Sequence, residues 1–175
     1  MSNKNPIGVM KVKDFGEIKF ELYPEVAPIT VANFIELINK GFYNGLTFHR
    51  IIKNFVIQGG CPQGSGMGDP GYSIKGEFKL NGVENNIKHE LGVLSMARAN
   101  HPNSGGSQFF IMVGNAPHLD GSYAAFGKVI EGLDVVLNIA EEPVFGDMPK
   151  NKPVIEKVEI DTFGVNYELK DEDKF

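Results

Sequence analysis

The sequence predicts a mainly β fold with about eight short strands and two helices. Three observations support this fold class. The 21 glycines and 10 prolines fall between short apolar runs, which is typical of strands joined by tight turns. Some of these runs alternate apolar and polar residues with the period of two expected of a half-buried strand. Only two segments carry an apolar stripe at helical spacing, and a length of 175 residues suits one domain.

The first elements along the chain are two predicted strands followed by a helix. The strands cover Ile7 to Lys13 and Glu17 to Leu22, and every second residue of the second strand is apolar. The helix is expected between Thr30, whose side chain can cap its N-terminus, and Gly41, which ends it. Its apolar stripe consists of Val31, Phe34, Ile35 and Ile38.

The rest of the chain predicts further strands and one more helix. A glycine-rich loop from Gly59 to Gly76 separates the strands, and the second helix covers Leu133 to Ala140. We expect one domain over residues 1–165, followed by a short charged tail, residues 166–175, that frays. The predicted strands are Leu46 to Ile52, Phe55 to Ile57, Leu91 to Ala97, Phe109 to Val113, Ala124 to Val129 and Val154 to Phe163.

Short strands leave many sheet edges, and these edges limit the possible architectures. Closing a sheet on itself removes its edges, because every strand then has a partner on both sides. We therefore expect a closed eight-stranded β-barrel whose open ends are capped by two α-helices. A two-sheet sandwich is the alternative architecture.

Charge and hydropathy exclude several classes of protein. Lys plus Arg is 17 and Asp plus Glu is 22, so the net charge of −5 does not favour nucleic-acid binding. The longest apolar run, Phe109 to Val113, is far shorter than the ~20 residues that span a membrane. The chain has one cysteine and no apolar leader after Met1, so we expect a cytoplasmic protein. No dimerisation stripe stands out, which favours a monomer.

The sequence lacks the patterns of a metal, phosphate or cofactor site. No pair of its four histidines has the spacing of a helical zinc site, and Cys61 is the only cysteine. The segment 64–68 is rich in glycine, but turn residues follow it instead of the Gly-Lys-Ser/Thr that opens a helix in phosphate loops. We therefore expect neither a metal nor a cofactor.

Nucleophilic chemistry is also disfavoured. Ser104 and Ser107 lie in a glycine-rich loop without the strand–turn–helix that presents a nucleophilic serine. Cys61 has no lysine, arginine or histidine within several residues that would lower the pKa of its thiol. A passive role for Cys61 is therefore favoured over a reactive one.

Arg50 and Gln58 are the most informative polar residues, because each lies in an apolar, strand-like run. The period of two places Arg50 on the same face as Phe48 and Ile52. Removing a guanidinium from water among apolar neighbours is unfavourable unless a partner pairs with it. Two interpretations are equally supported by these features. Arg50 is either a structural residue bound by carbonyls or a carboxylate, or part of a binding surface with Gln58 and several phenylalanines.

Four segments carry longer motifs, of which the central one, residues 48–60, reads FHRIIKNFVIQGG. In order and spacing, these segments resemble the signatures of cyclophilins, the cyclosporin-type peptidyl-prolyl isomerases. The resemblance implies an eight-stranded antiparallel barrel capped by two helices, with a groove on its outer face. It also implies catalysis of rotation about Xaa-Pro bonds during protein folding. The other matching segments are residues 27–34, 94–99 with 103–111, and 119–129.

The resemblance implies a role for each site residue. Arg50 is the expected catalytic residue, Gln58 the residue that holds it and binds the substrate backbone, and Phe55 a wall of the proline pocket. The expected partners are proline-containing peptides and unfolded or partly folded proteins. No bond breaks during isomerisation, so no nucleophile, metal or cofactor is needed. The remaining expected substrate-binding residues are Val56, Ala97, Arg98, Ala99, Gln108, Phe110, His118, Leu119 and Tyr123.

Four positions depart from the common cyclophilin pattern. Val56 stands where methionine is frequent, and His118 where the best-known members have tryptophan. Tyr123 replaces a histidine of many eukaryotic members, a change associated with bacterial sequences. Cys61 replaces the aspartate that usually follows the paired glycines. The absence of the tryptophan implies weak binding of cyclosporin-type ligands.

Two further hypotheses for the function remain. The altered Val56 and His118 are compatible with a proline-peptide binding module, or a holdase chaperone, whose isomerase activity is incidental. A ligand-carrying closed barrel, such as a lipocalin, is the third hypothesis, and it requires an internal cavity.

Overall fold

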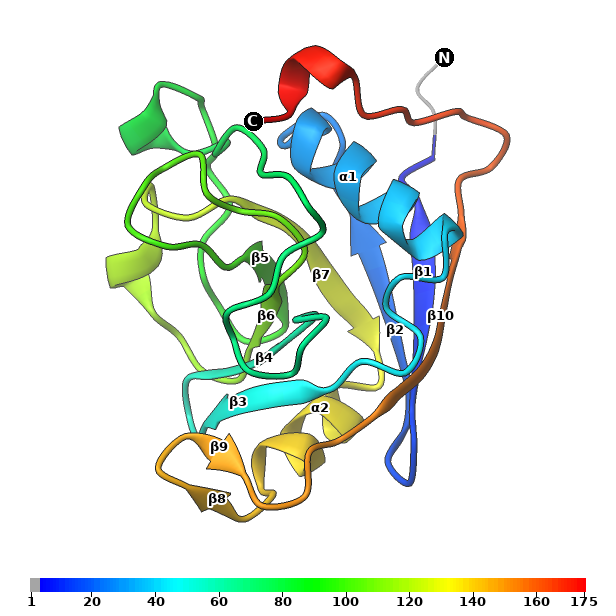
Figure 1. The fold of residues 1–175 in the computed structure, drawn as a ribbon, viewed down its shortest axis with the longest axis vertical. Helices are drawn as coiled ribbons and strands as arrows, with labels where there is room; N and C mark the ends of the chain where they lie inside the picture. Colours follow the sequence, from blue (N-terminus) through cyan, green and yellow to red (C-terminus); the bar gives the residue numbers. More distant parts are fainter. Residues whose placement is uncertain (1–3) are drawn as a thin grey trace.

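The computed structural model describes residues 4–175 and contains one curled antiparallel sheet, a small hairpin and two α-helices (Figure 1). The helices are α1, Pro28–Asn39, and α2, Leu133–Ala140, the latter with the predicted bounds. Three short 3₁₀ helices are η1, Lys79–Asn81, η2, Pro117–Leu119, and η3, Asp171–Asp173. The strands are β1 Ile7–Val12, β2 Gly16–Leu22, β3 Phe48–Ile52, β4 Val56–Gly59, β5 Val93–Met96, β6 Phe109–Met112, β7 Ala125–Glu131, β8 Val144–Phe145, β9 Met148–Pro149 and β10 Ile155–Asp161.

The eight-stranded sheet has the order β10-β1-β2-β7-β5-β6-β4-β3, and all neighbouring strands are antiparallel. One sheet of this size excludes the two-sheet sandwich. Its edges are β3 and β10, so the sheet is an open, strongly curled half-barrel and the expectation of a closed barrel is wrong (Figure 1).

The physical reason lies at the outer edge of β3. The segments before the two edge strands meet, because Thr47 and Val154 form an isolated antiparallel bridge. Beside it, the N–H of Phe48, the first residue of β3, donates to the carbonyl of Pro153 at 3.0 Å. Farther along β3, the N–H of Ile51 donates to the carbonyl of Asp147 at 2.7 Å, in the hairpin formed by β8 and β9. A strand edge can pair with one neighbour at a time, so this hairpin takes the place that β10 would need to close the barrel.

Strand alternation divides the side chains of β6 between the two faces of the sheet. Phe109 belongs to the core inside the curl, whereas Phe110 belongs to a separate apolar cluster. Inside the curl, the ring of Phe109 packs edge-on against Phe34 of α1, with a centroid distance of 5.4 Å. Side chains therefore fill the space that a ligand-carrying barrel would keep open, which contradicts the lipocalin hypothesis. Phe34 also contacts the rings of Phe20, Tyr43 and Phe126.

The N-terminus of α1 differs from the prediction. The helix begins at Pro28, and Thr30 lies inside its first turn, so the expected capping by Thr30 is wrong. Proline suits this position, because it has no N–H to satisfy and its φ is already helical. The free N–H groups of Ile29 and Thr30 instead donate to the carboxylate of Glu77, at 3.2 and 2.6 Å. A buried side chain from a distant loop thus caps the helix.

The C-terminal tail packs against the domain, so the expectation that it frays is wrong. Phe175 and Ser73 exchange two backbone hydrogen bonds, with N···O distances of 2.8 and 3.2 Å. Leu169 is buried in the main core, and Tyr167 packs against it. Figure 1 shows this segment, in red, passing beside α1. Apolar residues within a charged stretch therefore anchor it.

Among residues 4–175, no helix has both the length and the apolar composition needed to cross a membrane.

Candidate active site

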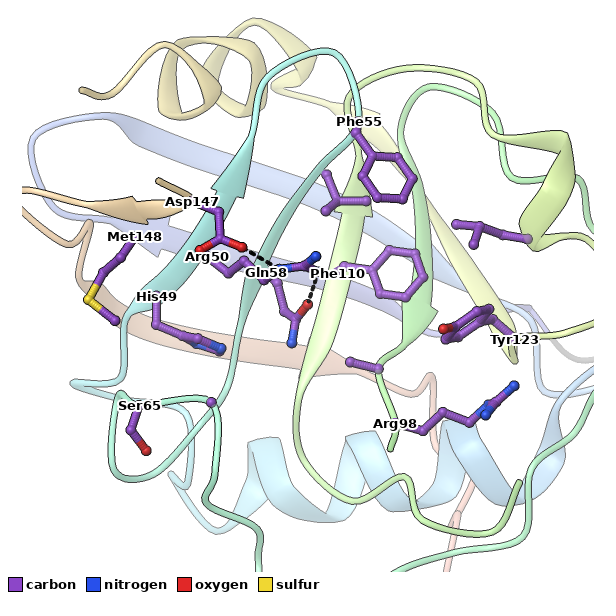
Figure 2. Close-up of a pocket in the computed structure, with 14 residues that line it drawn as sticks. His49, Arg50, Phe55, Gln58, Ser65, Arg98, Phe110, Tyr123, Asp147 and Met148 are labelled. Atoms are coloured by element: carbon purple, nitrogen blue, oxygen red, sulfur yellow. Dashed lines mark hydrogen bonds and ion pairs between the residues drawn. The ribbon is translucent and has the colours of Figure 1, made fainter. Parts of the chain in front are cut away.

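A cleft of about 370 Å³ lies on the outer face of the sheet, beside β3, β4 and β6 (Figure 2). Arg50 comes from β3, Gln58 from β4 and Phe110 from β6, so the antiparallel pairing of these strands brings together residues far apart in the sequence. Most of the expected site residues line this cleft, namely Arg50, Phe55, Val56, Gln58, Ala97, Arg98, Phe110, Leu119 and Tyr123.

The three other expected residues lie close by but do not line this cleft. Ala99 and Gln108 line an adjoining pocket of about 470 Å³. This pocket and the cleft have four lining residues in common, Gln58, Gly66, Ala97 and Arg98. His118 lies on η2, and its ring stacks on Phe55 with a centroid distance of 5.9 Å and an interplanar angle of 26°. His118 therefore supports the Phe55 wall of the cleft from outside.

Arg50 is held at two points. It lies opposite Gln58 in the β3–β4 register, and its Nη1 donates to the Gln58 Oε1 at 3.1 Å. Its Nε donates to the Asp147 Oδ2 at 3.2 Å (Figure 2). The carboxylate partner that the structural interpretation requires is therefore present, and the binding-surface interpretation stays a prediction. Arg50 is paired with a carboxylate, and it also lines an open cleft beside aromatic residues.

A chain of amide hydrogen bonds fixes the orientation of Gln58. Its Nε2 donates to the Oε1 of Gln108 at 3.0 Å. The Nε2 of Gln108 in turn donates to the carbonyls of Gly66 and Gly68, at 2.9 and 3.0 Å. Because each amide nitrogen is occupied in this way, the oxygen of Gln58 faces Arg50. The glycine-rich loop thus helps to orient the guanidinium through two glutamines.

The other side of the cleft is apolar. Phe110 is 5 % exposed and belongs to a cluster with Val56 and Leu119. Its ring packs edge-on against Tyr123, with a centroid distance of 5.8 Å and an interplanar angle of 80°. Figure 2 shows Phe55, Phe110 and Tyr123 along the side opposite His49 and Met148. The cleft therefore places a cation beside a wall that suits a small apolar ring.

Arg98 contributes its side chain to the framework of the site. Its Nη2 and Nε donate to the carbonyl of Ser122, at 2.6 and 3.2 Å. Its guanidinium also lies over the rings of Phe78 and Tyr123, at 4.8 and 4.6 Å from their centroids. These contacts tie the loop after β5 to the Tyr123 loop.

His89 supports the apolar wall, and the sequence did not assign it a role. His89 is 2 % exposed, and its ring stacks on Phe110 with a centroid distance of 6.1 Å. Its Nδ1 lies 2.9 Å from the Asp120 Oδ1 and its Nε2 lies 2.9 Å from the Ser95 Oγ. Burial lowers the pKa of His89 and outweighs the opposing effect of Asp120. The folded protein therefore favours the neutral ring.

We expect the free energy of unfolding to fall as the pH drops below about 6.5, the usual histidine value. The lowered pKa of His89 means that protonation favours the unfolded chain, so this stability is present above that pH and is lost at lower pH. Burial and the nearby Lys152 lower the pKa of His49 as well, which adds to the same trend. Each pKa unit corresponds to about 1.4 kcal/mol.

Urea unfolding at pH 7.5 and pH 5.5 measures this effect. The difference in the free energy of unfolding between the two pH values should be smaller in a His89→Gln variant than in the wild type, because the glutamine amide does not titrate in this range. An unchanged difference would assign the pH dependence to other groups.

The glycine-rich loop from Gly59 to Gly76 surrounds the thiol of Cys61 with backbone N–H groups, which the sequence did not predict. The thiol is buried, which raises its pKa, but backbone N–H groups of the loop outweigh burial and lower the value to about 7. Two of these donors are Gly66 and Gly68, whose nitrogens lie 3.3 and 3.2 Å from Sγ. These donors are backbone groups, so the residue types around Cys61 do not reveal them.

Sequence reasoning also missed Asp147 and Met148, which line the cleft from the β8–β9 hairpin. Asp147 lies 97 positions after Arg50, and no periodic pattern connects two such distant residues. Three further residues, His49, Ser65 and Gly66, line the cleft although they were not among the expected site residues. Among residues 4–175, no group of three or more His, Cys, Asp or Glu is arranged to hold a metal ion.

Comparison with known proteins identifies the family. Residues 8–162 match the family model described as cyclophilin type peptidyl-prolyl cis-trans isomerase. The chain belongs to the cyclophilin family. Its enzyme class is therefore that of the peptidyl-prolyl cis-trans isomerases.

Relatives and solved structures agree with this family. Peptidyl-prolyl cis-trans isomerase B of Bacillus subtilis is 51 % identical over 141 residues, which cover 81 % of this cyclophilin and 95 % of the relative. A peptidyl-prolyl cis-trans isomerase of Helicobacter pylori is 48 % identical over 128 residues, covering 72 % and 76 % of the two chains. A Cryptosporidium parvum cyclophilin, crystallised in the presence of the dipeptide Ala-Pro, has a TM-score of 0.81 and 34 % identity. That match covers 89 % of this cyclophilin and 98 % of the Cryptosporidium parvum chain.

Proposed function

We propose that this cyclophilin catalyses rotation about Xaa-Pro bonds in proline-containing peptides and in unfolded or partly folded proteins, at the cleft beside β3, β4 and β6. One observation carries the proposal. The guanidinium of Arg50, oriented by Gln58, lines the same open cleft as the apolar side chain of Phe110. The Ala-Pro dipeptide that was present with the Cryptosporidium parvum cyclophilin supports the class of substrate.

The chemistry requires a group that recognises a twisted amide. Resonance gives the C–N bond partial double-bond character and a rotation barrier of ~18–20 kcal/mol. Twisting removes this resonance and localises a lone pair on the proline nitrogen, which then becomes a hydrogen-bond acceptor. A guanidinium directed at this nitrogen binds the twisted form more tightly than either planar isomer. Such preferential binding of the transition state is catalysis.

Arginine suits this task because it stays charged and carries several donors in one plane. A charge-assisted hydrogen bond contributes about 1.5–3 kcal/mol, which corresponds to a rate enhancement of roughly 10- to 100-fold. We assign the rest of the rate enhancement to apolar contacts that hold the proline ring in place. Phe55, Phe110 and Leu119 provide an apolar surface for the ring while the preceding carbonyl swings.

The adjoining pocket gives the substrate chain a path beyond the proline. Ala97 lines both the cleft and this pocket, whereas Ala99 and Gln108 line the pocket alone. We propose that residues before the proline follow this path, so that Ala97 and Ala99 border them. Gln108 supports the same region through its hydrogen bond to Gln58.

Exchange spectroscopy by NMR on a short Ala-Pro peptide tests the function. The wild-type protein should accelerate exchange between the cis and trans peptide signals in proportion to its concentration, whereas an Arg50→Ala variant should accelerate it far less. No acceleration by the wild type would refute the proposal. Peptide affinity that survives Arg50→Ala, together with negligible acceleration by the wild type, would instead indicate a binding module or holdase.

A further inference from the structure

The ion pair between Asp147 and Arg50 joins the strand that carries the proposed catalytic residue to a hairpin outside the eight-stranded sheet. We infer that Asp147 is a positioning residue, which holds the guanidinium of Arg50 in the orientation that the reaction needs. This inference rests on the proposed function of the cleft. It assigns to the β8–β9 hairpin a direct part in arranging the site.

The guanidinium has two anchors at different nitrogens. Asp147 accepts from Nε, and Gln58 accepts from Nη1. One anchor alone leaves a planar group free to rotate about that hydrogen bond, whereas two anchors fix both its position and its plane. Of the five N–H donors of an arginine, these contacts use two and leave three for the cleft.

The need for a second anchor follows from the exposure of Arg50. Its side chain is 39 % exposed, so packing alone does not restrict its rotamers. A long side chain samples many orientations when it is not held, and only some of them direct a donor at the proline nitrogen. In Figure 2, the Asp147 carboxylate lies on the same side of the cleft as Arg50. Its hydrogen bond restricts the rotation of the Arg50 side chain before the substrate binds.

The hairpin keeps its place without the carboxylate. The backbone carbonyl of Asp147 accepts from the N–H of Ile51 at 2.7 Å, next to Arg50 on β3. The hairpin is closed by the hydrogen bond from Lys150 N to Pro143 O, at 2.9 Å, and Gly146 adopts a positive φ of 71° at its turn. Shortening the side chain of Asp147 therefore removes one anchor of Arg50 and leaves the backbone contacts intact.

Steady-state kinetics on an Ala-Pro peptide separate positioning from substrate binding. We expect Asp147→Ala to lower kcat about tenfold with a change in KM below about twofold. The reason is that a less ordered Arg50 guanidinium stabilises the transition state less, whereas substrate binding does not depend on it. Asp147→Asn keeps an oxygen that can accept from Nε, and should restore kcat to within about threefold of the wild type.

The matched control is Glu141→Ala. Glu141 forms an ion pair with Lys53 at 2.8 Å, and both side chains are about as exposed as Asp147, but neither residue lines the cleft. This variant should keep the kinetic constants of the wild type. The urea midpoints of all three variants should match that of the wild type, because exposed ion pairs contribute little to stability.

A second readout does not depend on activity. The Nε–H proton of Arg50 gives its own NMR signal, which can be assigned by its loss in an Arg50→Lys variant. Its exchange with water should become at least about tenfold faster in Asp147→Ala and stay slow in Glu141→Ala. If the wild type lacked isomerase activity, the proposed function would fail, while this signal would still report whether Asp147 holds Arg50.

Three results would overturn the inference. The first is an unchanged kcat in Asp147→Ala. The second is a rise in KM at constant kcat, which would make Asp147 a substrate contact. The third is an Nε–H signal whose exchange does not respond to the loss of the carboxylate.

Discussion

An Arg50→Ala variant is expected to lose roughly 10- to 100-fold in kcat/KM for an Xaa-Pro peptide, the contribution of one charge-assisted hydrogen bond. The loss should appear mainly in kcat, because the bond to the proline nitrogen forms only as the amide twists. Arg50→Lys should recover little of the lost activity. The lysine ammonium lacks the planar array of donors with which a guanidinium can bind Asp147, Gln58 and the substrate at once. NMR exchange or a protease-coupled assay measures these values.

A matched control is Lys53→Ala, which removes a cation close to Arg50 in the sequence. The amine of Lys53 pairs with Glu141 and its side chain is 63 % exposed. It does not line the cleft, so this variant should keep the activity of the wild type. If Lys53→Ala reduced turnover as much as Arg50→Ala, the effect would reflect the general charge of this region. Turnover by Arg50→Ala at the wild-type rate would remove Arg50 from the mechanism.

Phe34→Ala should have the largest effect on stability, with a loss of about 3–5 kcal/mol in the free energy of unfolding. Phe34 is fully buried on α1 and contacts rings from three strands and a loop. Removing it leaves a cavity that the surrounding strands cannot collapse to fill, since each is held by its hydrogen-bonded neighbours. Urea unfolding, followed by circular dichroism, gives the value.

Leu137→Ala on α2 is the control for Phe34. Leu137 is 39 % exposed, so its truncation should lower the free energy of unfolding by less than about 1 kcal/mol. The isomerase activity per folded molecule should stay close to that of the wild type in both variants, because neither residue lines the cleft. A loss below about 1 kcal/mol for Phe34→Ala would show that the aromatic cluster is not the main anchor of α1.

Periodic patterns were sufficient to identify most elements of the fold. The alternation in β2 and the apolar stripes of the two helices depend on residues a few positions apart. They can therefore be recognised in the sequence without knowledge of tertiary contacts. The same alternation separates Phe109 from Phe110 and so divides core from cleft. The missed β8–β9 hairpin is short and has no extended pattern, and its place depends on the edge of β3.

The candidate site likewise contains residues that the sequence predicted and residues that it did not. Arg50 and Gln58 lie eight positions apart on two paired strands, within a single recognisable motif. Asp147 reaches Arg50 from 97 positions away, and His89 reaches Phe110 across separate segments. Such contacts have no local signature, because any carboxylate or imidazole in a loop can make them once the chain has folded.

Residue patterns alone were enough to predict the mainly β character, the two helices and the motif that carries the proposed catalytic arginine. The open sheet, the capping of α1 by Glu77 and the pairing of Asp147 with Arg50 became visible only in the folded chain. This difference comes from the range of the interactions. Backbone periodicity acts between neighbouring residues, whereas edge pairing, helix capping by distant loops and ion pairs depend on which segments packing brings together.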